Sequence, residues 1–265
     1  MTSADEPGRP EDAAQAARPL LTYKNMPVPY TTGWSSEEVT LTGSPDMMLR
    51  HPPGGGAPYV AYRDEIPGAE IRPHGVLWGR MPDTPGVGEP RFLGQNINRQ
   101  KAVMERAGCS VCGGDGEVWL VPAMVWEEYL AEDGPGAPYE TSDPPVCRAC
   151  IPLATGTCPN LRQHGFLFLE VRKWSISGVR GYVADPITLK FPEHDNDVPL
   201  HGAVGYDAAR LRLTLAKGLL VTLRGITAHT DPDRVRGLGR RRGDEQRSAS
   251  GRARADRIPG PRRGD

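Results

Sequence analysis

The sequence predicts an α+β fold: a loop-rich domain with short strands and few helices. Glycine and proline account for 32 and 27 of the 265 residues, which predicts many turns. Hydrophobic residues make up 38% of the chain and Phe occurs 4 times, so we expect a modest core. Short runs rich in Val, Ile and Tyr alternate with segments that have helical spacing. The length allows one large domain or two small ones.

The first part of the chain is predicted to be irregular. Residues 1–19 are polar, rich in Ala and Pro and without periodicity, so we expect them to be disordered. Residues 20–94 form an irregular, β-containing segment. Within it, "PYVAYRDE" and "GVLWGR" are predicted to be short strands, separated by loops such as "HPPGGGAP".

Residues 95–164 contain the clearest local patterns. "NINRQKAVMERAG" is predicted to be a helix, because Ile97, Lys101 and Met104 follow helical spacing and Gly108 can end it. The next pieces are predicted to be a strand, "EVWLVP", and a short helix, "AMVWEEYLAED".

Residues 165–230 are predicted to form an α+β segment that packs on the preceding region. "GFLFLEVRKW" and "GVRGYVADPITLKF" have the composition of two strands with Gly-containing turns between them. "YDAARLRLTLAKGLLVTLRG" fits either a helix capped by Asp207 or a strand that turns at Lys217 and Gly218. We favour the helix, because the apolar run is too long for one strand.

Charge is distributed unevenly along the chain. Residues 234–265 hold 11 Arg and 4 acidic residues, a net charge of +7, while the remainder holds 21 basic and 29 acidic residues, a net charge of −8. We expect residues 231–265 to be a disordered, Arg-rich tail. Such a tail can contact phosphates without sequence preference, and a merely solvated extension is the alternative. The candidate contacts are Arg240, Arg241 and Arg242, with Arg99, Lys101 and Arg148 as weaker ones.

The expected location is the cytoplasm. No run of about 18 apolar residues suggests a membrane span, and the first residues lack the apolar core of a signal peptide. A cytoplasmic chain keeps its thiols reduced. The abundance of Ala, Gly, Pro and Arg is typical of a GC-rich, bacterial genome.

Four of the five cysteines form two CxxC pairs, Cys109 with Cys112 and Cys147 with Cys150. Two such turns can present four thiolates to one Zn²⁺ ion at about 2.3 Å from each sulfur. Gly113 and Gly114 provide the backbone freedom that a tight first knuckle needs, whereas the second knuckle lacks Gly and must close differently. Four sulfur ligands leave no position for water or substrate, so the expected zinc is structural.

Other uses of these cysteines fit the pattern less well. A thioredoxin-like motif has one CxxC, and the spacing matches neither ferredoxin pattern. Cys158 and His164 can replace one ligand or serve a second ion, although a lone extra Cys is usually a small buried hydrophobe. The run "HDNDVPLH", residues 194–201, can bind a hard cation or form an ordinary solvated loop.

The order of these motifs resembles the treble-clef zinc finger, and most closely its HNH-endonuclease type. The resemblance covers about residues 97–160, through "ERAG", "CSVCGG" and "DPPVCRAC". In that family, the strand after the first knuckle carries metal-binding and catalytic His residues, and Asn follows the second knuckle. Here the strand and its continuation are "EVWLVPAMVW", and Ile151 follows the second knuckle. The resemblance therefore implies a structural finger without the nuclease machinery.

We therefore expect a zinc-binding, non-enzymatic binding or adaptor protein that contacts nucleic acid or a protein partner. The alternative is a divergent HNH-like metal-dependent nuclease or another hydrolase. Convergent His and Asp side chains in a cleft would favour the enzyme, and a flat apolar or basic patch would favour binding.

Overall fold

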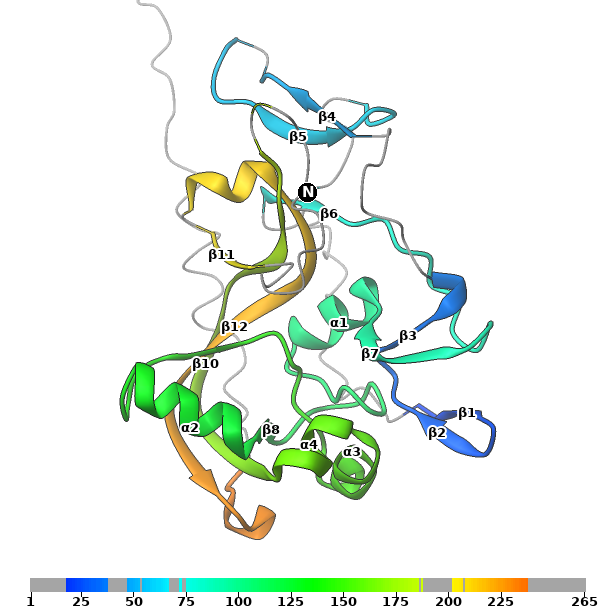
Figure 1. Cartoon of the computed structure of the whole chain (residues 1–265), viewed down its shortest axis with the longest axis vertical. Coiled ribbons are helices and arrows are strands. Elements are labelled where there is room, and N and C mark those ends of the chain that lie inside the picture. The colour runs from blue at the N-terminus through cyan, green and yellow to red at the C-terminus, as the bar shows by residue number, and fades with distance from the viewer. Residues whose placement is uncertain are drawn as a thin grey trace, which may run out of the picture.

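The structure is a computed structural model that describes residues 18–37, 47–52, 54–66, 72, 75–185, 187, 202–206 and 208–237. It is a mixed α+β fold, as predicted, in which strands outweigh helices (Figure 1). Of residues 1–19, which were predicted to be disordered, 1–17 lie outside the described residues, as do the run 194–201 and Arg240, Arg241 and Arg242.

Two long antiparallel strands form the axis of a six-stranded sheet. They are β10 (Phe166–Val183) and β12 (Thr214–His229), which pair along almost their whole length. The ladder contains two irregularities, between Ile176 and Gly178 and between Arg180 and Gly181. Such bulges increase the local twist of a ribbon.

Shorter strands pair with this ribbon at different points along its length (Figure 1). At one end, β8 (Trp119–Pro122) pairs with β10, and near the middle of the ribbon β9 (Tyr139–Thr141) pairs with β12. At the other end, β11 (Gly202–Gly205) pairs with β10, and β6 (Leu77–Trp78) runs parallel to β12. The sheet therefore joins segments from most of the described chain.

Among the described residues, three small two-stranded sheets add to the β structure. One is the hairpin of β1 (Leu21–Tyr23) and β2 (Met26–Val28). Its turn residues Lys24 and Asn25 have φ values of 49° and 64°, the backbone that a tight hairpin turn requires. The others pair β3 (Thr32–Trp34) with β7 (Pro90–Gln95), and β4 (Met47–Arg50) with β5 (Tyr59–Tyr62).

The part of the chain that the structure describes contains four α-helices, all of them short. The first two confirm the sequence prediction: α1 (Ile97–Met104) and α2 (Ala123–Glu132). Asn96 caps α1, because its side chain accepts hydrogen bonds from the amides of Asn98 and Arg99. The helices α3 (Ile151–Thr157) and α4 (Pro159–His164) follow the second cysteine pair. The 3₁₀-helices are η1 (Ser35–Glu37), η3 (Arg148–Cys150), η4 (Ala209–Leu213) and η5 (Pro232–Arg234).

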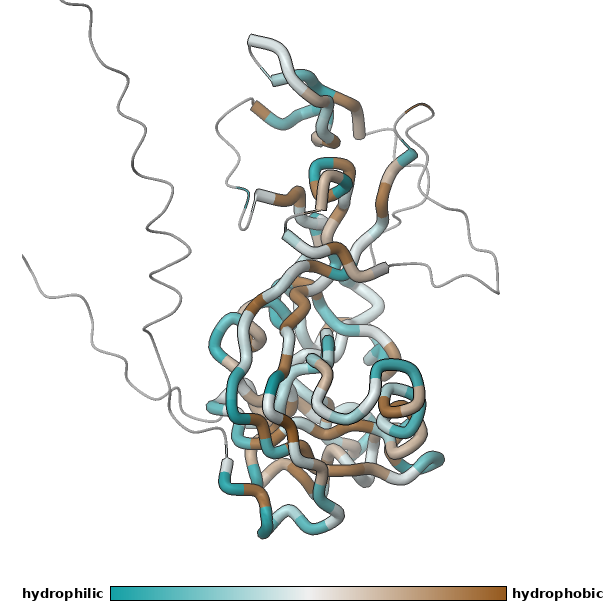
Figure 2. Tube along the Cα trace, turned by 90° about the vertical axis from the view of Figure 1, so that its left-hand side faces the viewer, coloured by the Kyte–Doolittle hydropathy of each residue, from teal (hydrophilic) through white to brown (hydrophobic). Residues whose placement is uncertain are grey.

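The main core lies between the long ribbon and the first two helices. Hydrophobic and hydrophilic positions alternate along much of the trace (Figure 2), as expected for elements with one buried face. The helix α1 packs on β12, and α2 packs on β8 and β10. The buried side chains that these elements contribute include Met104, Trp119, Trp126, Tyr129, Leu169, Val171, Leu219, Val221 and Leu223.

Gln100 joins α1 to β12 by hydrogen bonds in the interior. Its Oε1 accepts from the Leu219 amide at 2.9 Å, and its Nε2 donates to the carbonyls of Leu219 at 3.1 Å and Ser142 at 2.8 Å. Buried backbone groups need such partners. A side chain of α1 thus replaces part of the strand ladder of β12.

Two secondary-structure predictions for residues 165–230 are wrong. The segment from Tyr206 to Gly225 is not the favoured helix: its first part contains η4, and the remainder lies in β12, without a turn at Lys217 and Gly218. The two expected strands after residue 165 are one continuous strand, β10. Residues 214–223 are nearly all buried, so β12 has a continuous apolar run in place of the alternation that identifies a half-exposed strand.

The short strands predicted around residues 59, 77 and 119 are confirmed as β5, β6 and β8. In the part of the chain that the structure describes, no helix combines the length and apolar character needed to cross a membrane.

Candidate metal centre

The four cysteines of the two CxxC pairs meet in one cluster. The Sγ atoms of Cys109, Cys112, Cys147 and Cys150 all lie within 4.8 Å of one another, and the Cys112 and Cys147 sulfurs are 3.8 Å apart. In a tetrahedral Zn²⁺ site with metal–sulfur bonds of about 2.3 Å, neighbouring sulfurs are about 3.8 Å apart. A disulfide needs about 2.05 Å, and all five cysteines of the chain are free thiols. The cluster therefore fits a metal ion.

The first knuckle is a tight turn stabilised by its own backbone. The Cys109 amide donates to the Gly114 carbonyl at 2.7 Å, and the Gly113 amide donates to the Cys109 carbonyl at 2.9 Å. The Cys112 amide lies 3.5 Å from the Cys109 sulfur, which it approaches as a donor. Gly113 has φ 69°, the left-handed backbone that glycine adopts most readily. The predicted need for Gly is thus confirmed at Gly113.

The approach to this knuckle differs from the prediction at one residue. Beyond α1 the chain turns through Ala107, which has φ 52°, whereas the sequence indicated Gly108 as the stop. The Gly108 amide then donates to the Val103 carbonyl at 2.6 Å. A Cβ on Gly108 would lie 2.6 Å from the Arg106 guanidinium, so a larger residue there would require the Arg106 side chain to shift.

Arg106 supports the first knuckle from outside. Its Nη2 donates to the Gly113 carbonyl at 2.5 Å and its Nη1 to the Gly114 carbonyl at 3.1 Å. These two carbonyls end the turn that holds Cys109 and Cys112. Sequence reasoning missed this role, because an Arg three residues before a cysteine has no recognisable signature of its own.

The second knuckle closes without glycine, as expected. Cys147 precedes η3, and the Cys150 amide donates to the Cys147 carbonyl at 3.0 Å. The Arg148 amide donates to Oε2 of Glu117 at 2.6 Å. A carboxylate from the other knuckle's side of the cluster therefore fixes the turn, a role that the sequence alone did not indicate.

The environment of Cys109 and Cys150 is unfavourable for isolated negative charge. Burial raises the pKa of Cys109 to about 11, and burial together with the neighbouring Cys109 raises the pKa of Cys150. At Cys112, burial acts in the same direction, but hydrogen bonds from the Gly114 amide and the neighbouring thiols outweigh it and lower the pKa. A divalent cation would compensate four such thiolates at once.

A small hydrophobic cluster surrounds the sulfurs, and an N-terminal segment contacts the first knuckle. The Arg18 amide donates to the Cys112 carbonyl at 3.0 Å, and the Tyr30 and Thr31 amides donate to the carbonyls of Val111 and Ser110 at 2.8 and 3.0 Å. The segment is thus joined to the first knuckle on both sides of the β1–β2 hairpin. The apolar side chains of the surrounding cluster include Val111, Val118, Val146, Ile151, Ala154, Phe168 and Val235.

Cys158 and His164 do not join the four sulfurs. Cys158 lies between α3 and α4, and His164 ends α4. Within the described ranges, the four cysteines are the only group of three or more His, Cys, Asp or Glu side chains close enough to share an ion.

Arg148 is partly exposed, and its guanidinium is engaged with the end of the described chain. Its guanidinium donates to the carbonyls of Pro232, at 2.8 Å, and Val235. Residues 231–237 therefore pack on the second knuckle, whereas disorder was predicted from residue 231 onwards.

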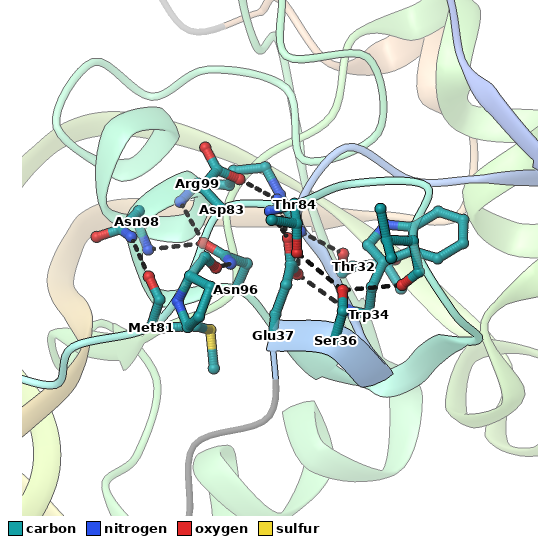
Figure 3. Close-up of polar contacts among 12 residues, drawn as sticks. Thr32, Trp34, Ser36, Glu37, Met81, Asp83, Thr84, Asn96, Asn98 and Arg99 are labelled. Atoms are coloured by element: carbon teal, nitrogen blue, oxygen red, sulfur yellow. Dashed lines mark hydrogen bonds and ion pairs between the residues drawn. The ribbon is translucent and has the colours of Figure 1, made fainter.

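Arg99, predicted as a nucleic-acid contact, is buried, so that prediction is wrong. Its side chain is 2% exposed and forms an ion pair with the fully buried Glu37 at 2.7 Å. It also donates to the Thr32 carbonyl at 2.8 Å and to Asp83. Figure 3 shows Arg99 and Glu37 directed toward each other inside this network. A guanidinium held in this way has no free surface to offer a phosphate.

Lys101 is partly buried against an aromatic ring. Its Nζ lies 4.9 Å from the centroid of the Trp78 ring, a cation–π contact. The structure therefore does not bring Arg99, Lys101 and Arg148 together as a basic patch: each has its own internal partner.

Fold and site together define an α+β protein with a buried four-cysteine cluster suited to a metal ion such as zinc. No protein-family model matches the chain, and comparison with curated proteins and with solved structures found no match. The likeness to the HNH type of zinc finger is thus a resemblance in short motifs.

Proposed function

We propose that this chain is a zinc-binding protein whose metal has a structural role, and that it acts as a non-enzymatic binding or adaptor protein in a reducing compartment such as the cytoplasm. The observation that carries the proposal is the convergence of four sulfur atoms within 4.8 Å. Soft thiolates in a tetrahedral arrangement favour zinc over hard cations such as Mg²⁺ or Ca²⁺.

The donor set supports a structural role for the metal. When four protein sulfurs occupy the four positions of a tetrahedral ion, none is left for water or substrate. The ion would instead connect two knuckles that lie 35 positions apart between Cys112 and Cys147. Because a preformed site rarely exists in an unfolded chain, binding free energy at such a site contributes directly to folding.

The proposed binding partner is a nucleic acid or another protein. The proposal of a nucleic-acid partner rests on the Arg-rich residues 238–265. The finger's own Arg99 and Arg148 already bind groups of the same chain. A structural metal, an acidic body and a basic extension are compatible with a protein that holds a partner without transforming it.

Metal analysis of the purified full-length chain tests the proposal. We expect about one zinc per chain and no iron, as for a closed four-thiolate site. Cys112→Ser and Cys147→Ser should each lose most of the zinc and lower the melting temperature, because the shell is no longer complete.

Cys158→Ser is the matched control, since Cys158 stands outside the cluster. It should retain the metal and melt as the parent protein does. Full zinc occupancy in the Cys112→Ser/Cys147→Ser double variant would contradict the assignment.

A further inference from the structure

Residues 231–237, which we name the C-terminal latch, are built into the metal centre. Val235 is 2% exposed and belongs to the same apolar cluster as Cys109, Cys112 and Cys150. The Val235 amide donates to the Pro232 carbonyl at 3.1 Å, which forms a single 3₁₀ turn. A buried side chain and an ordered turn thus fix the latch to the finger.

Arg148 is the main polar contact between latch and finger. It occupies the position after Cys147, inside the second CxxC motif, and its guanidinium donates to the carbonyls of Pro232 and Val235. The Arg148 guanidinium also lies 3.7 Å from the exposed carboxylate of Asp233. An ion pair this exposed adds little stability. The backbone carbonyls are therefore the contacts that matter.

The direction in which Arg148 points depends on the knuckle that carries it. Its amide is bound to Glu117, and Cys147 and Cys150 flank it within the cluster. A metal that holds both cysteines would fix the backbone of this turn, whereas a metal-free turn keeps only its hydrogen bonds. The metal state should therefore decide whether the guanidinium meets the two latch carbonyls.

A second contact fastens the far end of the latch to the sheet. The Arg236 amide donates to Oε2 of Glu170 at 3.2 Å, and the same oxygen lies 3.6 Å from Nε2 of His229. Glu170 lies in β10 next to the strand pairs that adjoin the finger. The latch is thus held at two points, and one of them belongs to the metal knuckle.

We infer that the metal-loaded finger holds residues 231–237 in place and that the metal-free finger releases them. Since the Arg-rich residues follow directly after Gly237, the metal state would set whether the residues just before the basic segment are held to the finger. This inference rests on the proposed function, because it requires that the four cysteines bind a metal.

Trypsin is a direct probe, because it cleaves after arginine and the latch contains Arg234 and Arg236. In the zinc-loaded full-length chain, we expect slow cleavage after both arginines. Mass spectrometry of the fragments measures the cleavage rate. Removal of zinc by a chelator should accelerate this cleavage at least tenfold. The Arg148→Gln variant should show the same acceleration with its zinc content unchanged, whereas Arg162→Gln, which alters an exposed arginine of α4, should behave as the parent.

The possible failures are distinguishable. A chain that takes up no zinc contradicts the proposed function and the metal dependence together. A chain that binds and loses zinc with no change in cleavage after Arg234 and Arg236 overturns the latch alone. Chelation could loosen the whole fold, which cleavage at the distant β11 end of the sheet would reveal. In that case the zinc-loaded Arg148→Gln variant separates the two effects. If cleavage after Arg234 and Arg236 in this variant is as slow as in the parent, the inference is overturned.

Discussion

Glu37 is fully buried, yet its carboxylate accepts four hydrogen bonds. Two come from the Arg99 guanidinium, at 2.7 Å each, and two from the amides of Trp34 and Thr84, at 2.9 and 2.8 Å. Burial raises the pKa of Glu37, but the Arg99 and amide hydrogen bonds outweigh it, so that this pKa lies below its ordinary value of 4.5. The carboxylate is therefore ionised wherever the protein is folded at neutral pH.

Glu37→Gln should be strongly destabilising. It leaves the Arg99 charge without its main partner in the interior, for which about 3–5 kcal/mol of unfolding free energy is typical. Urea unfolding at pH 7 measures this loss. Because the folded pKa lies below 4.5, the stability that ionised Glu37 contributes is present above that pH and is lost as pH falls through the folded pKa. The Gln variant should lack this part of the acid transition.

The control for that prediction is Asp64→Asn. Asp64 pairs with Arg80 at 2.8 Å, but its side chain is 70% exposed. Exposed ion pairs contribute at most about 1 kcal/mol, so this change should hardly move the urea midpoint. Equal losses in the two variants would mean that burial does not set the strength of the Glu37 pair.

For individual residues, sequence spacing was sufficient to predict the thiol cluster but not the residues that hold it in place. A CxxC pair is a local pattern, so the four cysteines and the turn at Gly113 could be predicted. Glu37 and Arg99 are 62 positions apart, and the contact of Arg148 with Pro232 spans 84 positions. Such partners are set by the fold, which is why Arg99 and Arg148 were assigned to a surface role.

Among the elements, β12 is the one whose type the sequence obscured. Leu211, Leu215, Leu219 and Leu223 recur every four residues, which matches a helix face. The strand is nevertheless buried along residues 214–223, so that apolar residues occupy consecutive positions and no alternation remains. The helices α1 and α2 were predicted correctly because each has one apolar face and clear ends.

The contact between α1 and β12 gives a prediction at this scale. Gln100→Met keeps a similar volume but removes the donor and acceptor that satisfy the Leu219 amide and the Leu219 and Ser142 carbonyls. A buried polar group left without a partner costs about 1–3 kcal/mol. We therefore expect the free energy of unfolding to fall by about 2 kcal/mol or more, measured by denaturant titration.

Gln163→Met provides the comparison, because Gln163 is exposed on α4. Surface substitutions of this kind usually change stability by no more than about 0.5 kcal/mol. Hydrogen exchange should also differ between the two variants: the Leu219 amide loses protection in the first and keeps it in the second. Retained protection in Gln100→Met would show that the strand finds another partner.

For the whole molecule, charge is segregated along the chain. The body is acidic, whereas residues 238–265 hold 9 Arg and 4 acidic residues. We expect affinity for nucleic acid to reside in this segment, to lack sequence preference and to fall linearly in log affinity with log salt concentration. A gel-shift series at increasing salt, with the full-length chain and a chain ending at Gly237, measures it.

The shorter chain should keep its zinc and lose the affinity. Replacing Arg240, Arg241 and Arg242 with Gln should make the plot of log affinity against log salt concentration less steep. The change should be at most the contribution of about 3 phosphate contacts. Equal binding by the chain ending at Gly237 would place the contact on the body instead. Cleavage of DNA or RNA with added Mg²⁺ would favour the metal-dependent nuclease, and no binding at low salt would favour a protein partner.

The two long strands also set where this chain can change length in evolution. Strands β10 and β11 are joined by residues 184–201, and the paired ends that adjoin this connection, at Gly181 and Gly202, are fixed by the sheet. Doubling the length of a loop between two fixed ends costs only about 0.6 kcal/mol, so we expect insertions between these two strands to cost little. This connection starts about 50 Å along β10 from Phe168, which packs beside the thiols. It is therefore the natural place to splice in a guest domain or a fluorescent reporter without disturbing the metal centre.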